Sequence, residues 1–321
     1  LEGIIYLYVP LAKISELTVD FSFLWLIGGV LFIIIAAFLG FKMLHRLTRP
    51  LAAMKEAAER VSGGDYSARV NIRSDDEIGQ LAKAFNLMSE SVQKEDEKKR
   101  EFLADVSHEL RTPISYIKGY SEALETGMIK ENDEKNKYLK LINRESGRMV
   151  KLVEDLLDLS RLDADEYRLV KNPFPLAQLI EDFIIKYGPA LKEKNISLTL
   201  ELDPDIIING DEGRLEQIFQ NIIDNSIRYT ESGGKISVIL TKHSYGCKVE
   251  IEDTGIGIPE EDVNKLTERF YRVNKARSRA DGGTGLGLAI VDKLVKLHDG
   301  KMEIASELGE GTTIRLYFPA V

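Results

Sequence analysis

The sequence is poor in the residues that build covalent or metal cross-links. Its 321 residues include one cysteine, Cys247, and four histidines that lie far apart in the chain. These numbers exclude an internal disulfide framework and a cysteine-based zinc site, and the histidines show no metal-ligand spacing. Positive charge is also in deficit, because the net charge is −9. We therefore expect no direct binding to nucleic acid.

The length and the balance of residue types indicate several domains. Hydrophobic residues make up 44% of the chain and charged residues 30%, which excludes a disordered chain and a multi-spanning membrane protein. A chain of 321 residues is longer than most single hydrophobic cores can organise. Because the first residue is Leu1 rather than methionine, we expect a fragment or a processed product.

Residues 21–41 form a long apolar run without charged side chains. As a helix, this run would cover the ~30 Å hydrocarbon core of a bilayer. Lys42, Arg46 and Arg49 follow it, so the positive-inside rule predicts a cytoplasmic C-terminal part. We expect a transmembrane helix over residues 21–44 that contacts membrane lipid. Residues 1–20 are then the end of an extracytoplasmic sensor region, with a strand over residues 3–14.

Two amphipathic helices are predicted after the membrane run. Pro50 suits the first turn of a helix, which Gly63 and Gly64 then end. A second helix begins near Asp75 and has apolar residues in steps of three and four, which is heptad spacing. These residues are Ile78, Leu81, Phe85, Met88 and Val92. The arrangement resembles a HAMP linker, which we assign to residues 45–97, and the alternative is an ordinary helical hairpin.

The next predicted helix carries a histidine outside its apolar seam. The seam consists of Phe102, Val106, Leu110, Ile114 and Ile117. His108 should therefore face solvent or a partner, where a neutral imidazole can act as a nucleophile. Glu109 could hydrogen-bond one ring nitrogen, Thr112 shares a face with His108, and Pro113 should loosen the helix. For the residue alone, an ordinary surface histidine is the alternative.

The segment SHELRTP at residues 107–113 resembles the phosphoacceptor box of sensor histidine kinases. The resemblance implies that His108 accepts a phosphoryl group and that Glu109 acts as its base. It also implies that Thr112 positions water for dephosphorylation.

A second heptad helix is predicted after a loop at residues 127–132. Glu145 interrupts its apolar seam, and we expect this carboxylate to pair with Arg144 or Arg148. The two helices would form a hairpin with a broad apolar face. A single hairpin cannot cover this face by itself. We therefore predict a dimeric four-helix bundle over residues 98–165.

From about residue 168, predicted helices alternate with short strands. We expect strands at 196–201, 235–241, 247–252, 301–305 and 312–318, and we read Pro173 and Pro175 as part of a linker. This order predicts an α/β sandwich over residues 166–321 with helices on one face of the sheet.

Three polar motifs in this last region suit a nucleotide. Asn221 and Asn225 share one helix face, and amide oxygens are suitable ligands for Mg²⁺. Asp253 follows a predicted strand, so its carboxylate could accept the amine of an adenine. The glycine loop 282–287 runs into a helix, an arrangement that holds phosphates. Singly, each motif has an alternative: surface asparagines, a tight turn, or a glycine loop without a ligand.

In this order, the motifs resemble the N, G1 and G2 boxes of the histidine kinase catalytic domain. The segment FYR at 270–272 resembles its F box, beside a basic lid that includes Lys275, Arg277 and Arg279. The resemblance implies ATP and Mg²⁺ as cofactors, with Asn221 and Asn225 at the metal. The implied nucleotide-binding residues are Asn221, Asn225, Arg228, Tyr229, Asp253, Gly255, Gly257, Arg272, Gly283, Thr284, Gly285, Leu286 and Gly287.

The sequence departs from the family pattern at a few positions. Arg228 stands where lysine is common, which keeps the charge but changes the geometry of its donors. Thr267 occupies a lid position that is usually phenylalanine, which could loosen the packing of the lid. Neither departure removes a catalytic group.

The predicted fold is multidomain: a transmembrane helix, an all-α HAMP linker and helical hairpin, and an α/β sandwich. The resemblance implies a homodimeric sensor histidine kinase of the cell membrane with a cytoplasmic kinase region. It would phosphorylate His108, pass the phosphoryl group to an aspartate of a response regulator, and act as a phosphatase of that regulator. One alternative is a GHKL-type ATPase, which would release phosphate without becoming labelled. The other is a non-catalytic membrane signalling scaffold, which would not bind an ATP analogue.

Overall fold

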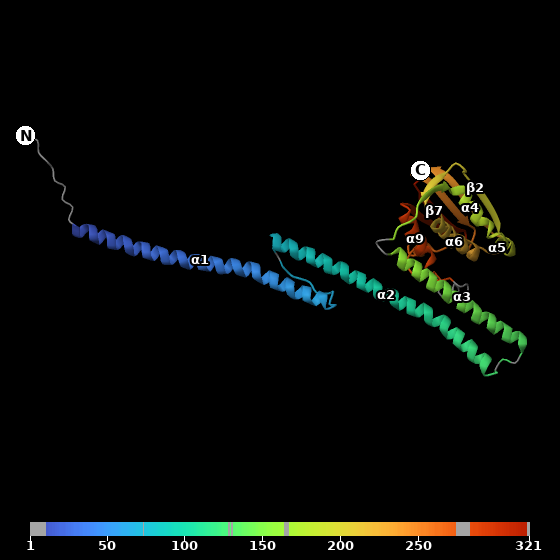
Figure 1. The fold of residues 1–321 in the computed structure, drawn as a ribbon, viewed down its shortest axis with the longest axis horizontal. Coiled ribbons are helices and arrows are strands. Elements are labelled where there is room, and N and C mark those ends of the chain that lie inside the picture. The colour runs from blue at the N-terminus through green and yellow to red at the C-terminus, as the bar shows by residue number, and fades with distance from the viewer. Residues whose placement is uncertain are drawn as a thin grey trace, which may run out of the picture. The chain divides into compact units, whose positions relative to one another are not determined.

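A computed structural model describes residues 11–72, 74–127, 129, 131–163, 167–273 and 283–319, with the backbone alone for residues 11–20. The chain divides into two compact units, residues 1–101 and 102–321. Figure 1 shows long helices followed by a mixed domain of helices and strands. The elements are α1 Leu11–Ser62, α2 Glu77–Glu125, α3 Asn132–Leu162, β1 Asn172–Pro175, α4 Leu176–Ile185, α5 Gly188–Glu193, β2 Ser197–Leu202, β3 Ile207–Gly210, α6 Glu212–Tyr229, β4 Lys235–His243, β5 Gly246–Asp253, α7 Glu260–Val263, α9 Gly287–Leu297, β6 Lys301–Glu307 and β7 Gly311–Phe318.

Helix α1 begins earlier and ends later than the predicted membrane helix. Residues 11–14 are helical, so the predicted strand is wrong there, and its residues 3–10 lie outside the described part of the chain. Leu11, Ile14 and Leu17 repeat every three residues, a spacing that fits a helix and not an alternating strand. The apolar part of α1 reaches a mean hydropathy of 2.6 and is long enough to cross a membrane.

Pro50 lies inside α1, and the prediction that it begins a helix is wrong. Proline removes one backbone hydrogen bond and crowds the preceding turn, but a long helix on both sides can tolerate that local defect. The side chain of Thr48 donates a hydrogen bond to the carbonyl oxygen of Leu44 at 2.7 Å in this turn. Helix α1 then ends where predicted, at Ser62, with Gly64 in the left-handed region at a φ of 93°.

In the first unit, a small apolar cluster joins the end of α1, the connector and the start of α2. Asn86 pins the connector because its amide accepts from the Val70 backbone N–H at 2.8 Å and donates to the Val70 carbonyl at 2.9 Å. Leu81 and Met88 of the predicted heptad seam remain about half exposed in this single chain. The buried members are Met54, Ala57, Ala68, Val70 and Ala82.

The second unit begins with a hairpin made by the last part of α2 and by α3. Helix α2 continues through Pro113 to Glu125, and α3 starts at Asn132, which agrees with the predicted loop. Leu152 and Leu159 of the α3 seam are buried. Glu145 pairs with Arg144 at 3.1 Å and Arg148 at 3.9 Å, as expected for a carboxylate within an apolar seam.

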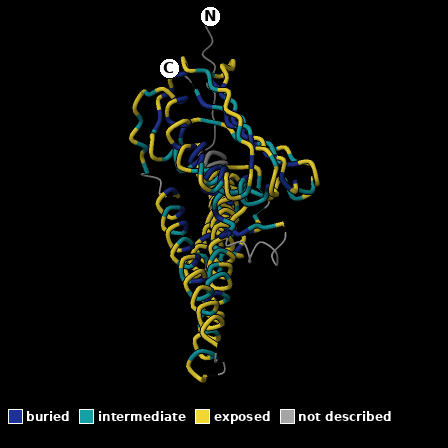
Figure 2. Tube along the Cα trace, turned by 90° about the vertical axis from the view of Figure 1, so that its right-hand side faces the viewer, coloured by how far each residue is buried: buried dark blue, intermediate teal, exposed yellow. Residues whose placement is uncertain are grey.

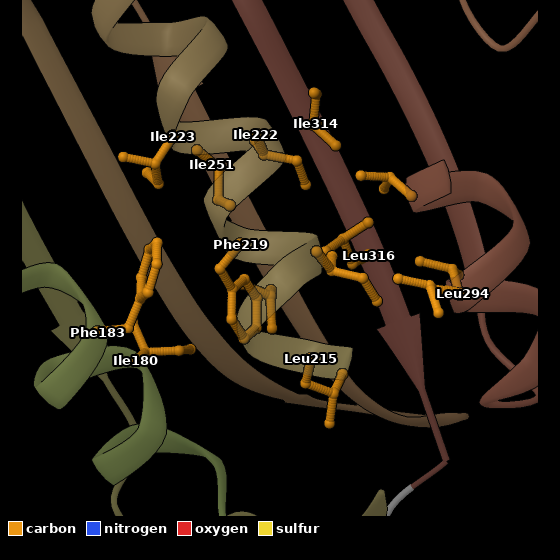
Figure 3. Close-up of a cluster of buried hydrophobic side chains, with 14 of the residues drawn as sticks. Ile180, Phe183, Leu215, Phe219, Ile222, Ile223, Ile251, Leu294, Ile314 and Leu316 are labelled. Atoms are coloured by element: carbon orange, nitrogen blue, oxygen red, sulfur yellow. The ribbon is translucent and has the colours of Figure 1, made fainter. Parts of the chain in front are cut away.

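The part of the second unit that follows the hairpin contains a five-stranded sheet in the order β2-β4-β5-β7-β6. Strands β2 and β4 are parallel, and the other neighbours are antiparallel. One face of the sheet is apolar and packs against α4, α6 and α9, as Figure 3 shows for Ile251, Ile314 and Leu316. Figure 2 shows that buried segments gather in this domain. The structure therefore has the predicted sandwich with helices on one face.

A two-stranded sheet lies where the sequence predicts a linker. Residues of β1, including Pro173 and Pro175, pair antiparallel with β3, and Phe174 lies opposite Ile208. Proline is tolerated in a strand that has one partner, because its missing N–H can face away from the ladder. The backbone N–H of Leu176 then donates to the Ile206 carbonyl, which fixes the start of α4.

Candidate functional site

A cavity of about 640 Å³ lies between α6, the loop after β5 and the start of α9. Two predicted residues, Gly255 and Leu286, are absent from its lining among the described residues. Leu286 is fully buried in the apolar core, and the backbone N–H of Gly255 donates to Asp253 instead. The predicted residues that line the cavity are Asn221, Asn225, Arg228, Tyr229, Asp253, Gly257, Arg272, Gly283, Thr284, Gly285 and Gly287.

Helix α6 positions the two asparagines. Asp211 caps its N-terminus by accepting a hydrogen bond from the Arg214 backbone N–H at 3.2 Å. The apolar face of α6 is buried under the sheet, which leaves Asn221 and Asn225 on the cavity side. The Asn221 side-chain NH₂ donates to the Gln217 carbonyl at 3.0 Å, so its amide oxygen is available to a ligand. That oxygen is so close to Gly287 that an added Cβ there would lie 2.8 Å away.

Asp253, the last residue of β5, supplies a fixed acceptor at the other end of the cavity. Its carboxylate is buried and accepts hydrogen bonds from the Ser226 hydroxyl and the Gly255 backbone N–H, each at 3.0 Å. Burial raises the pKa of Asp253, and these hydrogen bonds oppose that change. A carboxylate held in this way can accept a hydrogen bond from an amine of a ligand.

The turn after β5 requires a glycine at position 257. Gly257 has a φ of 64°, and an added Cβ would lie 1.8 Å from the Glu307 carbonyl oxygen. This close approach lets the backbone form one wall of the cavity. The predicted lid residues Lys275, Arg277 and Arg279 lie outside the described part of the chain, whereas Arg272 lies on the cavity wall.

The turn of α2 that carries the predicted phosphoacceptor places His108 at the surface, as predicted. Thr112 lies one turn later, and its hydroxyl donates to the His108 carbonyl oxygen at 3.3 Å. Glu109 does not bond to the imidazole among the interactions of the described residues. Its carboxylate accepts from Arg148 at 3.0 Å and lies 3.7 Å from Nη1 of Arg272. Consecutive helical residues point about 100° apart, which explains why Glu109 and His108 face different neighbours.

The nucleotide-binding region packs directly on the hairpin. The Thr284 hydroxyl donates to the Asp155 carboxylate of α3 at 2.6 Å, and both groups are buried. Burial raises the pKa of Asp155, and the hydrogen bond from Thr284 opposes that change. Phe270 has a left-handed φ of 61°, and its ring lies 6.0 Å from that of Phe102 on α2.

The predicted site residues omit several charged residues of α3, among them Arg148, Lys151 and Asp155. Arg148 joins the Glu109 carboxylate, and Asp155 joins the glycine loop. A signal was present for Arg148, because an arginine three residues after Glu145 lies within reach of that carboxylate in the apolar seam. The sequence held no comparable signal for Asp155, whose partner is 129 residues away.

Family models match three parts of the chain. Residues 42–94 match the HAMP domain, and residues 98–165 match the His kinase A phospho-acceptor domain. Residues 210–321 match the histidine kinase-, DNA gyrase B- and HSP90-like ATPase. These matches follow the order of the helical connector, the hairpin and the nucleotide-binding region.

Curated relatives cover nearly the whole chain. It is 34% identical over 295 residues to the signal transduction histidine-protein kinase BaeS of Escherichia coli strain K12, covering 92% of this chain and 62% of BaeS. It is 33% identical over 329 residues to the sensor histidine kinase YclK of Bacillus subtilis strain 168, covering 99% of this chain and 68% of YclK. The chain therefore spans about two thirds of the length of these relatives.

A crystal structure of full-length ShkA in complex with AMPPNP has a TM-score of 0.50 and is 29% identical, covering 69% of this chain and 46% of ShkA. The comparison adds a structural likeness to the sequence likeness of BaeS and YclK. The ordered domains, the relatives and the cavity beside the histidine helix agree, and the chain belongs to the sensor histidine kinase family of two-component systems.

Proposed function

We propose that this chain transfers the γ-phosphoryl group of ATP to a ring nitrogen of His108. The observation that carries the proposal is the position of Arg272. This residue lines the cavity, and its Nη1 lies 3.7 Å from the carboxylate of Glu109, the neighbour of His108 on α2. The ion pair between Arg272 and Glu109 would therefore connect a nucleotide in the cavity to the helical turn that carries His108.

The cavity suits a nucleotide along its length. Asp253 would accept the exocyclic amine of adenine, and Tyr229 lines the cavity near it. Gly283, Thr284, Gly285 and the N-terminus of α9 would hold phosphate oxygens through backbone N–H groups. The structurally similar protein ShkA has been solved in complex with AMPPNP, a nucleotide analogue, which supports this assignment.

The phosphate end of the cavity fits a magnesium ion. The Asn221 amide donates through its NH₂ to the Gln217 carbonyl, which orients its oxygen away from that carbonyl and toward Gly287. We assign the amide oxygens of Asn221 and Asn225 as metal ligands, because Mg²⁺ prefers oxygen ligands and retains waters or phosphates. When bound, Mg²⁺ would neutralise phosphate charge, and Arg228 and Arg272 would add cationic stabilisation.

The transfer exchanges one bond to phosphorus for another. A neutral ring nitrogen of His108 attacks the γ-phosphorus, the bond to the bridging oxygen breaks, and ADP leaves. The other ring nitrogen must then lose its proton, for which Glu109 is the adjacent base. Glu109 is paired with Arg148 in the structure, so we expect it to exchange this partner for the imidazole before transfer.

The exposed position of His108 also suits a second protein. A receiver aspartate of a response regulator would take the phosphoryl group from the imidazole, restoring the free histidine. For the opposing phosphatase activity, Thr112 would position a water for hydrolysis of the phosphorylated regulator. Its hydroxyl already lies on the face of His108, where it donates to the His108 carbonyl.

The hairpin supports assembly into a homodimer. One of its faces keeps large apolar side chains exposed in the single chain, which is costly in water. A second copy of the hairpin would cover this face in a four-helix bundle. The exposed residues are Leu103, Ile114, Leu139, Val150, Val153 and Leu157.

A charge on that face should separate the dimer. We expect Val153→Glu to raise the dimer dissociation constant at least about tenfold, because it would bury a carboxylate between apolar helices. Sedimentation of the detergent-solubilised chain measures this constant. Lys137→Glu, a change of charge at an exposed position of the same helix, is the matched control and should leave the dimer intact.

Helix α1 supports attachment to the cell membrane. Its apolar span is followed by Lys42, Arg46 and Arg49, which favour the cytoplasmic side. Residues 21–44 would contact lipid, and the kinase region would lie in the cytoplasm together with ATP and the regulator.

The phosphoacceptor assignment can be tested with the full chain in lipid nanodiscs. The chain is incubated with Mg²⁺ and γ-labelled ATP beside His108→Gln and the control His243→Gln, whose histidine is also exposed. We expect acid-labile, base-stable label on the unsubstituted chain and on His243→Gln, and none on His108→Gln.

The same assay separates the alternatives. ATP hydrolysis in His108→Gln, with no label on any of the proteins, would contradict the kinase and favour an ATPase. Failure of the unsubstituted chain to bind AMPPNP would favour a scaffold without catalysis.

A further inference from the structure

One lysine of the hairpin reaches the nucleotide cavity. Lys151 lies on α3, yet it is among the residues that line the cavity together with Asn221 and Asn225 of α6. Its Nζ lies 3.6 Å from the Asp224 carboxylate, and its side chain is 41% exposed. The phosphoacceptor hairpin therefore contributes a cation to the wall of a cavity that belongs mainly to the ATPase region.

The face of α3 that carries Lys151 is held firmly on the rim of the cavity. Asp155 lies one turn after Lys151, so the two side chains share a face. The Asp155 carboxylate accepts the buried 2.6 Å hydrogen bond from Thr284 in the glycine loop. Asp158, a further turn along, accepts from the Gln217 side chain of α6 at 2.8 Å. These contacts, one to the glycine loop and one to α6, place Lys151 at the cavity.

The negative charge of Asp224 must be offset by a cation if phosphates are to bind at this end of the cavity. It precedes Asn225 on α6, and its other carboxylate oxygen accepts a hydrogen bond from the Tyr187 hydroxyl at 3.0 Å. A carboxylate fixed beside the asparagines would repel the phosphates of a nucleotide. Lys151 offsets that charge, and a lysine with a flexible, partly exposed stem can move a few ångströms to a phosphate without losing much solvation.

We infer that Lys151 binds the phosphate chain of the nucleotide, so that α3 forms one wall of the nucleotide site when the ATPase region is docked on the hairpin. The inference rests on the proposed binding of ATP in this cavity. It makes nucleotide affinity depend on docking, because a domain that leaves the hairpin also loses the cation of Lys151. Nucleotide binding and docking of the ATPase region on α3 would then strengthen each other.

The test compares ligands with and without phosphates on the full chain in lipid nanodiscs. Calorimetric titration measures binding of AMPPNP with Mg²⁺ and, separately, of adenosine. For Lys151→Met we expect AMPPNP to bind about five- to tenfold more weakly, as for loss of one charge-assisted contact, and adenosine to change less than about twofold. Lys151→Arg should restore most of the AMPPNP affinity.

Lys140→Met is the matched control. Lys140 is exposed on the same helix, eleven residues earlier, which places it about 16 Å along the axis on nearly the same face. This variant removes the same charge and should leave both affinities unchanged.

Three results would overturn the inference. Equal AMPPNP affinity in the Lys151 and Lys140 methionine variants would show that Lys151 does not contact phosphate. Equal losses for AMPPNP and adenosine in Lys151→Met would show a structural role in docking. Absence of AMPPNP binding in the unsubstituted chain would remove the proposed function itself, and the inference with it.

Discussion

The helical turn of His108 and the cavity beside α6 place their polar groups in opposite environments. His108 lies on the outside of a helix, exposed to solvent. Asp253 lies at the end of a strand, buried and fixed by two hydrogen bonds. A residue that must meet both ATP and a second protein needs access, whereas a residue that recognises one ligand gains from a fixed and partly dry position. With the proposed function, the chain would separate reactivity from recognition by assigning them to different kinds of structure.

The largest difference between the two regions is expected in stability, when one glycine of each is replaced with alanine. Gly257→Ala should destabilise the nucleotide-binding domain by about 2 to 4 kcal/mol, because the Cβ would meet the Glu307 carbonyl and the φ is positive. Gly147→Ala on α3 meets nothing within 4 Å and should stabilise the hairpin by about 0.5 to 1 kcal/mol. Thermal unfolding followed by circular dichroism measures both. A loss of stability in Gly147→Ala would show that another chain packs closely at this position.

A smaller effect is expected on ligand recognition. Asp253→Asn keeps the size of the side chain but replaces one acceptor oxygen with a donor NH₂. We expect AMPPNP affinity to fall by about 2 to 3 kcal/mol, roughly 30- to 150-fold, with loss of the phosphohistidine label at low ATP concentration. Calorimetric titration measures the affinity. Glu252→Gln, an exposed neighbour on the same strand, is the control, and a similar loss there would remove the special role of Asp253.

The smallest effect concerns a histidine whose environment is the opposite of that of His108. His298 is buried, Nδ1 lies 2.8 Å from the Leu294 carbonyl, and Nε2 accepts from the Asp211 backbone N–H at 3.0 Å. Burial lowers the pKa of His298 from its ordinary value of 6.5. Because the unfolded chain binds the proton more readily, this histidine makes stability fall as the pH drops below about 6.5 toward the lowered folded pKa.

We expect stability to fall between pH 7.5 and 5.5 through this contribution, by at most about 1.4 kcal/mol, the limit that the unfolded pKa alone sets. Denaturant unfolding of the full chain at each pH measures it. His298→Gln should be less stable at neutral pH but should lose this part of the acid sensitivity, whereas the exposed-site variant His243→Gln should retain it. An unchanged pH dependence in His298→Gln would contradict the assignment of His298 as the group that titrates.

Most of the fold could be predicted because it depends on local periodicity. The heptad residues of α2 and α3 and the alternating strands β4, β5 and β7 follow directly from spacing along the chain. The errors occurred where a neighbour decides the structure. Pro173 and Pro175 belong to a strand because β3 lies beside them, and Pro50 lies inside a helix because the membrane span continues into it.

The candidate site could be predicted for the same reason, and only in part. Asn221, Asp253 and Gly257 lie in short motifs whose residues are close in sequence, and the structure places all three on one cavity. Contacts between distant segments left no local signal. Lys151 and Asp155 look like ordinary charged residues of a helix, and their positions at the cavity depend on how the ATPase region packs on α3.

The left-handed backbone of Phe270 has a further consequence for the packing around it. A bulky residue with a φ of 61° costs about 1 to 2 kcal/mol of backbone strain. Its N–H donates to the Gly285 carbonyl at 2.9 Å and its ring packs near Phe102, and these two contacts offset the strain. Any motion that takes Phe102 away removes part of that compensation, and the backbone at Phe270 then tends to relax. Phe270 therefore links the backbone conformation beside the glycine loop to the packing of α2.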